Sequence, residues 1–431
     1  MSKNPETIAL HGGDYRSDPA TTAVAVPLYR TTSYQFNDTG HAANLFALKE
    51  FGNIYTRIMN PTNDVLEKRV AALEGGLAAL TVGSGQAAST FAIMNVCQSG
   101  DNFISSTDLY GGTVNLFTHT LKKLGIECRY ADPADPKNFE KLIDEKTRCF
   151  YAETLPNPYL RVFPIKEVSD IGRKHNIPLI MDNTAAPVIC KPIEHGAAVV
   201  VYSLTKYIAG HGTVVGGALV DGGNFDWTAD AKRQPLFNEP DASYGGVVWG
   251  KAVPELTGAN VSFAVRARVT LLRDLGSALS PDNAFGVIQG LETVALRMKQ
   301  HCENAEKVVK LSDGYLRYPP ESNHIKGAEV KINWLEKIPN DSNGHVERQI
   351  KVFDYEMDDT LDEILMKYET EGLTHIIIDQ NQNRPSFFVD VFHNEEKYPF
   401  LIKEYDSKDD NLIYKVKIFK IDYDIFKILK N

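Results

Sequence analysis

The chain contains 431 residues, 43% of them hydrophobic and 24% charged, which is the composition of a globular protein with room for two or three domains. Its 46 basic and 56 acidic side chains give a formal net charge of −10, which argues against nucleic acid or an anionic membrane as a partner. We find neither a membrane-spanning run of roughly 18–20 apolar residues nor the apolar core of a secretory signal, so we expect a cytoplasmic protein.

The five cysteines are odd in number, scattered, and never spaced as C-x-x-C. This pattern predicts reduced, buried thiols and no metal site. The cysteines are Cys97, Cys128, Cys149, Cys190 and Cys302.

The first 60 residues are expected to form mostly an extended arm and loops. A helix follows, with Thr62 as its expected N-cap and with Leu66 and Leu73 on its apolar stripe. Gly75-Gly76 is the expected end of this helix.

Between about residues 78 and 220, short apolar runs alternate with stretches of helical spacing. Such alternation predicts an α/β fold with a largely parallel sheet covered on both faces. The expected strands are 79–82, 102–104, 126–130, 149–152, 179–181 and 199–202, and the expected helices are 86–97, 114–123 and 165–171.

Towards the C-terminus the composition changes. One long helix is expected over 284–309, after which Asp, Lys, Ile, Tyr, Phe and Asn largely replace Ala and Gly. In the tail we expect a helix at 360–368 and strands at 349–353, 375–378 and 414–421. We therefore divide the chain into an arm (1–60), a main α/β domain (61–260), a connecting helical region (261–311) and an atypical small α/β domain (312–431).

Polar groups follow several expected strands, at the edge where open α/β sheets bind their ligands. Ser84-Gly85-Gln86 lies between a strand and a helix, where backbone N–H groups can hold an anion, although a plain tight turn also explains the pattern. Tyr110 precedes two glycines, and its ring could lie on a flat ligand or fill the rim of the core.

Two charged residues complete this set. Asp182 ends an apolar strand, where its carboxylate could cap a helix, bind a metal, act as a base or hold a cationic ring nitrogen. Lys206 follows the strand 199–202, where we expect partial desolvation to lower its pKa and make the amine nucleophilic. Ser203 and Thr205 offer hydroxyls to a phosphate on the same face.

Together these groups suit pyridoxal 5′-phosphate (PLP). That cofactor needs an imine-forming lysine, an acid against its pyridine nitrogen, an aromatic side chain on its ring and an anion cradle. The acid keeps the ring nitrogen protonated, and a close ion pair in a partly buried site supplies on the order of a few kcal/mol towards this.

A set of longer motifs carries a family resemblance over about residues 5–311. The motifs are TIALHGG (7–13), YTRIMNPT (55–62), SGQAA (84–88), ETLPNP (153–158), DNT (182–184), SLTKY (203–207) and LET (291–293). With them the chain resembles the Cys/Met-metabolism family of fold-type I PLP enzymes. The insertion at 44–51 is similar to the O-acetylhomoserine sulfhydrylase branch rather than to the cystathionine lyases.

The resemblance implies roles for individual residues. Lys206 matches the Schiff-base lysine and proton shuttle, Asp182 the acid paired with the pyridinium nitrogen, and Tyr110 the ring-stacking tyrosine. The other implied cofactor contacts are Ser84, Gly85, Gln86, Ser203 and Thr205 around the phosphate, Thr184, and Asn157 near the cofactor's 3-oxygen. Tyr55 and Arg57 match residues that reach a neighbouring subunit's cofactor, which implies a homodimer or homotetramer.

The resemblance also implies a fold and a reaction. The fold is the fold-type I large domain, with a mostly parallel seven-stranded sheet flanked by helices. The reaction is γ-replacement on O-acetyl-L-homoserine by sulfide or a thiol, which gives homocysteine or methionine and acetate. Methionine γ-lyase and cystathionine-type γ-lyase or synthase activities stay open within the same family.

Beyond residue 311 the resemblance stops. Family members continue into a domain with an arginine that clamps the substrate's α-carboxylate, and Arg317, Arg348 and Arg384 of this tail do not stand in a matching context. A charge-assisted hydrogen bond contributes about 1.5–3 kcal/mol, so its loss weakens substrate binding. A PLP-binding but inactive chimera is therefore a third hypothesis.

Overall fold

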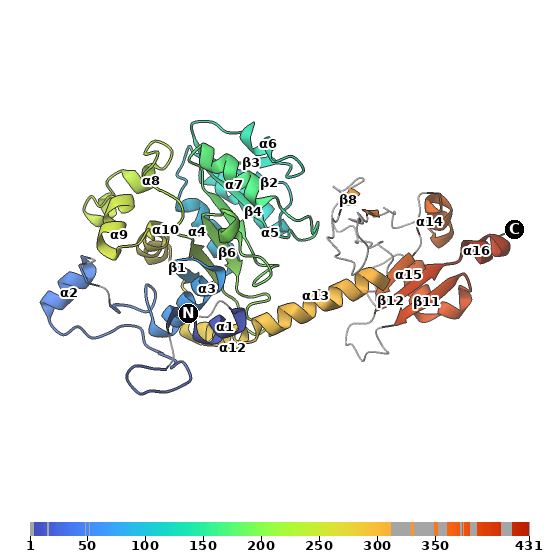
Figure 1. The fold of residues 1–431 in the computed structure, drawn as a ribbon, viewed down its shortest axis with the longest axis horizontal. Coiled ribbons are helices and arrows are strands. Elements are labelled where there is room, and N and C mark those ends of the chain that lie inside the picture. Colours follow the sequence, from blue (N-terminus) through green and yellow to red (C-terminus); the bar gives the residue numbers. More distant parts are fainter. Residues whose placement is uncertain are drawn as a thin grey trace, which may run out of the picture. The chain divides into compact units, whose positions relative to one another are not determined.

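The computed structural model describes residues 4–14, 17–47, 49–50, 52–311, 329–331, 349–351, 360–370, 373, 375–379, 386–406 and 416–430 (Figure 1). The chain divides into two compact units, Met1–Lys299 and Gln300–Asn431.

A seven-stranded sheet forms the centre of the first unit (Figure 1). Its strands are β1 (Ala78–Val82), β2 (Asn102–Ser106), β3 (Glu127–Ala131), β4 (Thr147–Glu153), β5 (Leu179–Asp182), β6 (Val199–Ser203) and β7 (Gly217–Asp221). They stand in the order β1-β7-β6-β5-β4-β2-β3, and only β7 runs antiparallel to its neighbours. The predicted mostly parallel seven-stranded sheet is confirmed.

Helices cover both faces of this sheet. The helices up to residue 311 are α1 (Pro5–His11), α2 (Thr39–Phe46), α3 (Pro61–Glu74), α4 (Gly85–Met94), α5 (Gly111–Asn115), α6 (Lys137–Glu140), α7 (Ile165–Lys174), α8 (Pro235–Asn238), α9 (Trp249–Thr257), α10 (Ser262–Arg266), α11 (Arg273–Leu275), α12 (Pro281–Leu291) and α13 (Val294–Leu311), and not all of them contact the sheet. Side chains of β4 alternate between the faces, so that Phe150 belongs to the hydrophobic cluster that includes residues of α3, α7 and α12, while Tyr151 belongs to the cluster that includes residues of α4 and α10. Burial on both faces explains the apolar runs 149–152 in β4 and 199–202 in β6.

The first turn of α3 corrects one prediction. Asn60 is the N-cap, because its side chain accepts a hydrogen bond from the Thr62 N–H at 2.9 Å. Thr62 lies inside the helix, and its hydroxyl donates to the Pro27 carbonyl at 2.8 Å, which ties the N-terminal segment to α3. Gly75 ends the helix as predicted, in the left-handed conformation with φ of 85°.

Residues 1–60 consist mostly of loops, as expected, and contain the short helices α1 and α2. One prediction about a helix was wrong. The helix expected over 284–309 is two helices, because the Gly290 carbonyl accepts from the Thr293 N–H at 3.2 Å and from the Arg297 guanidinium at 2.7 Å. These two bonds take the place of the regular helical hydrogen bond to the Gly290 carbonyl, and α12 ends at the next residue.

All five cysteines are free, as predicted. Cys97 and Cys149 are buried, Cys128 and Cys190 are half-buried, and the prediction of burial is wrong for Cys302, which is exposed on α13. In the part of the chain that the structure describes, no helix is both long and apolar enough to cross a bilayer.

The second unit has a hydrophobic core of its own. Strands β10 (His375–Asp379) and β11 (Leu401–Asp406) both pair antiparallel with β12 (Val416–Ile421). Helices α14 (Leu361–Tyr368), α15 (Ser386–His393) and α16 (Tyr423–Lys430) contribute to the core, and β8 (Glu329–Lys331) pairs with β9 (Gln349–Lys351). These elements have the predicted α/β character. The three tail arginines Arg317, Arg348 and Arg384 lie outside the described residues.

Glu74, at the end of α3, is a buried acid that makes stability depend on pH. It accepts a hydrogen bond from the Tyr202 hydroxyl, and burial raises its pKa from an ordinary 4.5 to about 8. Because the folded chain binds this proton more tightly than the unfolded chain, the contribution to stability is complete below pH 4.5 and is lost as the pH rises through about 8.

We expect Glu74→Gln to remove an alkaline loss of stability on the order of a few kcal/mol. Urea unfolding at about pH 6 and about pH 9 measures it, and the midpoint should fall less in the variant than in the wild type. Glu255→Gln, on the exposed side of α9, is the control and should behave like the wild type. If the urea midpoint fell equally between the two pH values in the wild type and in both variants, the prediction would be contradicted.

Candidate active site

One edge of the sheet collects most of the predicted site residues. The strands β1, β2, β4, β5 and β6 run in the same direction, so their carboxyl ends lie along this edge. The predicted residues that directly follow or end these strands are Ser84, Gly85, Gln86, Tyr110, Asn157, Asp182, Thr184, Ser203, Thr205 and Lys206.

Asp182 is held in a defined orientation at the end of β5. Its Oδ1 accepts from the Thr184 N–H at 2.9 Å, and its Oδ2 accepts from the Tyr151 hydroxyl at 3.4 Å. The Tyr151 hydroxyl in turn lies 3.0 Å from the hydroxyl of Ser89. Burial raises the pKa of Asp182, and the hydrogen bonds from Thr184 and Tyr151 oppose the rise. A cationic partner would keep this carboxylate ionised.

The start of α4 and the end of β6 approach each other closely. Ser84 is the N-cap of α4, and its hydroxyl accepts from the Ala87 N–H at 3.1 Å. A Cβ atom on Gly85 would lie 2.6 Å from the Ser203 Cβ, so only glycine fits there. The Ser203 N–H donates to Thr184 Oγ1 at 2.7 Å. N–H groups and hydroxyls therefore converge at a helix N-terminus, which is the arrangement that binds a phosphate.

The side chains of Gln86 and Tyr110 meet over Gly112. A Cβ atom on Gly112 would lie 2.5 Å from the Tyr110 ring and 2.7 Å from Gln86 Nε2. Gln86 Oε1 is buried and has no hydrogen-bond partner among the described residues, whereas Tyr110 is 48% exposed. A buried acceptor without a donor beside an exposed aromatic face is typical of a ligand site.

Glu153, at the end of β4, joins three predicted site residues and was not itself predicted. Its Oε1 accepts from the Tyr110 N–H at 2.6 Å and its Oε2 accepts from the Asn157 N–H at 3.3 Å. It also pairs in register with Asp182 across β4 and β5. Burial, followed by the charge of Asp182, raises the pKa of Glu153 to about 8. Glu153 could have been found from the sequence by the pattern that identified Asp182, because both are acids that end an apolar strand.

Lys206 lies in the turn that follows β6. Its N–H donates to the Ser203 carbonyl at 3.3 Å, and its carbonyl accepts from the Gly210 N–H at 2.8 Å. The hydroxyl of Thr205 contacts the carbonyl and the N–H of Gly216 at 3.2 Å and 3.1 Å. The Lys206 side chain is exposed, so the expected desolvation of its amine is wrong for the single chain, because the residue stands beyond the buried part of the strand.

Tyr55 and Arg57 contact each other, and Arg57 also contacts Arg273. The Arg57 guanidinium is 5.5 Å from the centre of the Tyr55 ring and donates to the Arg273 carbonyl. Within the described ranges, no hydrogen bond or ion pair links either residue to the ten at the sheet edge. Their reach to a neighbouring subunit stays a prediction.

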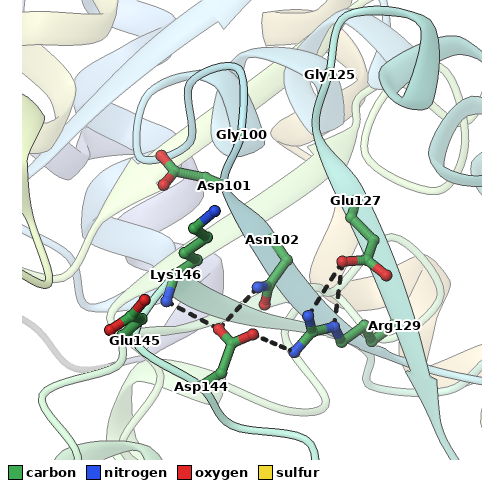
Figure 2. Close-up of a pocket in the computed structure, with 9 residues that line it drawn as sticks. All are labelled: Gly100, Asp101, Asn102, Gly125, Glu127, Arg129, Asp144, Glu145 and Lys146. Atoms are coloured by element: carbon green, nitrogen blue, oxygen red, sulfur yellow. Dashed lines mark hydrogen bonds and ion pairs between the residues drawn. The ribbon is translucent and has the colours of Figure 1, made fainter.

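A cavity of about 650 Å³ lies at the opposite edge, at the amino ends of β2, β3 and β4 (Figure 2). Its charged groups bind one another: Arg129 contacts Glu127 at 3.1 Å and Asp144 at 2.7 Å, and Asn102 Nδ2 donates to Asp144 at 2.9 Å. These contacts join neighbouring strands and already satisfy the side chains that make them. We therefore place the candidate site at the carboxyl edge.

Comparison with known proteins identifies the family of the chain. Residues 6–324 match the family model described as Cys/Met metabolism PLP-dependent enzyme. The O-acetyl-L-homoserine sulfhydrylase of Leptospira meyeri is 53% identical over 311 residues, which cover 71% of this chain and 70% of the relative. The homocysteine/cysteine synthase of Kluyveromyces lactis is 44% identical over 338 residues, which cover 76% and 75%.

Solved structures show the same fold. A putative O-acetylhomoserine (thiol)-lyase of Campylobacter jejuni, which carries N′-pyridoxyl-lysine-5′-monophosphate, is 41% identical with a TM-score of 0.68 and covers 76% of this chain and 78% of that one. Cystathionine gamma-lyase of Lactobacillus plantarum, complexed with L-serine, is 28% identical with a TM-score of 0.58 and covers 72% and 69%. The chain therefore belongs to the Cys/Met-metabolism family of PLP-dependent enzymes and has their α/β fold.

Proposed function

We propose that the chain catalyses PLP-dependent γ-replacement on O-acetyl-L-homoserine, with sulfide or a thiol entering and acetate leaving. The product is homocysteine or, with methanethiol, methionine. The observation that carries the proposal is the continuous set of contacts at the sheet edge, from Tyr110 through Glu153 and Asp182 to the turn of Lys206. The 53% identity to a sulfhydrylase, against 28% to a cystathionine gamma-lyase, supports this reaction over γ-elimination.

The residues at this edge fit PLP. The buried Gln86 Oε1 lacks a partner among the described residues, the Gly85 backbone allows close approach, and the half-buried Asp182 suits a protonated ring nitrogen. When bound, PLP supplies an electron sink for negative charge at the substrate's α-carbon. In our proposal Ser84, Gly85, Gln86, Ser203 and Thr205 would hold the phosphate, and Tyr110, Thr184 and Asn157 would contact the rest of the cofactor.

Three side chains do the chemistry in this proposal. Lys206 would hold the cofactor, and its Nζ would move protons between the substrate's carbon atoms. Asp182 keeps positive charge on the cofactor's ring nitrogen. The Tyr110 hydroxyl donates a proton to the departing acetate oxygen. Proton transfer by a positioned group contributes roughly 10²–10⁴ to a rate, so the tyrosine and lysine roles are measurable.

Tyr110→Phe is expected to slow acetate release at least about tenfold, because it removes the donor but keeps the ring. Cofactor attachment to Lys206 should be unchanged, since the ring and the Tyr110 N–H bond to Glu153 remain. Acetate release and visible absorbance measure the two effects. Tyr110→Ala, which removes the ring as well, should weaken cofactor binding. Wild-type turnover in Tyr110→Phe would refute the donor role.

The assay that tests the function compares two substrates. Purified protein with PLP receives either O-acetyl-L-homoserine and sulfide, or methionine alone. Homocysteine and acetate from the first mixture support γ-replacement, whereas a 2-oxo acid and thiol from methionine support a γ-lyase. Bound PLP without turnover in either mixture would identify an inactive chimera and overturn the proposal.

We further propose a cytoplasmic homodimer or homotetramer in which Tyr55 and Arg57 reach the cofactor of a neighbouring subunit. Among the described residues neither is bonded to the other ten within one chain, and Tyr55 is 41% exposed, which supports shared sites. The five free cysteines support a reducing compartment. Sedimentation of the purified protein measures the number of subunits.

A further inference from the structure

The turn that carries Lys206 packs against the junction between α12 and α13. A Cβ atom on Gly290, near the end of α12, would lie 2.0 Å from the Ala209 carbonyl oxygen, so turn and helix are in direct backbone contact. Ile208 and Ala209 are each only 1% exposed. The backbone that follows Lys206 is therefore set by this junction.

The guanidinium of Arg297, on the first turn of α13, holds the same backbone. Nη1 donates to the Tyr207 carbonyl at 2.6 Å, and Nη2 donates to the Ile208 carbonyl at 3.0 Å and to the Gly290 carbonyl at 2.7 Å. Tyr207 and Ile208 are the two residues directly after Lys206. One planar cation thus ties both of them to the end of α12, with a geometry that a lysine ammonium cannot reproduce.

Two further contacts fix the guanidinium itself. Its Nε donates to Thr293 Oγ1 at 3.2 Å. A Cβ atom on Gly210 would lie 2.2 Å from Arg297 Nη1, and Gly210 has φ of +70°, so glycine is needed for the guanidinium to lie there. The Gly210 N–H also donates to the Lys206 carbonyl at 2.8 Å. The cation is therefore packed against both ends of the turn.

We propose that Arg297 is a positioning residue of the active site, which acts by holding the turn that presents the Lys206 amine to the cofactor. The inference rests on the proposed function, because it needs Lys206 as the amine that binds PLP. Arg297 acts through the backbone of the turn, by its bonds to the Tyr207 and Ile208 carbonyls and its packing on Gly210. Since a misplacement of about 1 Å can cost about 10²-fold in rate, a looser turn lowers the turnover number more than it changes substrate binding.

The test uses the full-length holoenzyme with Arg297→Lys and Arg297→Met. Three quantities are measured: kcat, KM, and the pH midpoint of the visible absorbance of the lysine-bound cofactor. We expect kcat to fall about tenfold or more in the Met variant and less in the Lys variant, with KM within about twofold. The pH midpoint should shift by about half a unit or more, because the amine is held in a different place.

Arg173 supplies the matched control. Its guanidinium also bridges two backbone carbonyls, of Asn224 and Gly196, each at 3.1 Å, but at the opposite edge of the sheet. Arg173→Lys and Arg173→Met should lower the thermal midpoint and leave the pH midpoint and kcat unchanged. The inference is overturned if the Arg297 variants behave in the same way.

Two further comparisons keep the outcomes separate. Failure of the wild type to bind PLP overturns the proposed function, whereas a normal wild type with normal Arg297 variants overturns only the role of Arg297. If Arg297→Met does not fold, Thr293→Val takes its place, because it keeps the guanidinium and removes the contacts of the Thr293 hydroxyl to Arg297 Nε at 3.2 Å and to the Gly290 carbonyl at 3.3 Å. In Thr293→Val we then expect the pH midpoint to shift in the same direction as in Arg297→Lys, but by less. An unchanged pH midpoint in both variants overturns the inference.

Discussion

Lys206→Ala is expected to abolish covalent attachment of PLP and to lower turnover by at least about 10²–10⁴-fold, the contribution of a positioned proton-transfer group. The reason is chemical: alanine has no amine to form an imine or to carry the substrate's α-proton. The turn itself should survive, since the bonds that shape it use only the backbone of Lys206. PLP can still bind without a covalent bond through the phosphate and ring contacts.

Two measurements decide this prediction. Borohydride reduction of the wild type should fix a pyridoxyl label on the peptide that contains Lys206, and the label should be absent in Lys206→Ala. Lys251→Ala, which changes an exposed lysine on α9, should retain label and turnover. A label on another peptide, or a label retained by Lys206→Ala, would remove the basis for the proposed chemistry.

Asp182→Asn is expected to lower turnover by roughly 10²-fold while the bond to Lys206 still forms. A neutral amide cannot hold a proton on the cofactor's ring nitrogen, and an ion pair in a partly buried site is worth on the order of 3 kcal/mol. The amide oxygen can still accept from the Thr184 N–H, so the local backbone should keep its conformation. The loss should appear in kcat, with the visible absorbance shifted but present.

Asp221→Asn is the control for this change. Asp221 is also a buried acid at a strand end, and its carboxylate accepts from the Gly223 N–H at 3.0 Å and the Ala264 N–H at 3.1 Å, but it lies at the other edge of the sheet. Its substitution should affect thermal stability without changing the cofactor's spectrum. Equal kinetic effects of the two substitutions would show that Asp182 acts through general folding rather than on the cofactor.

The arrangement of the main sheet followed largely from local pattern. Strands such as β4 and β6 are continuous apolar runs because both of their faces are covered, and such runs can be found without knowing their neighbours. Residues at their carboxyl ends were expected to lie together because parallel strands end at one edge. Strand β7 was missed, since it follows a glycine-rich loop and its antiparallel place between β1 and β6 depends on distant residues.

Details that depend on a side chain from another element could not be predicted. The break between α12 and α13 follows from the Arg297 guanidinium at the Gly290 carbonyl, and nothing in the apolar spacing of 284–309 marks it. Asn60 replaced Thr62 as the cap of α3 because the Thr62 hydroxyl is used by the distant Pro27 carbonyl. In both cases a contact across many residues overrode a plausible local pattern.

The amino-acid sequence by itself determined the fold class, the family and the residue types available to bind PLP, because apolar runs, glycine turns and motif spacing are local properties. Only the tertiary structure decided how those residues are held. It showed that Glu153 holds the backbones of Tyr110 and Asn157 and that Arg297 holds the turn of Lys206. Hydrogen bonds between separate strands and helices depend on three-dimensional distance, which no spacing along the chain encodes.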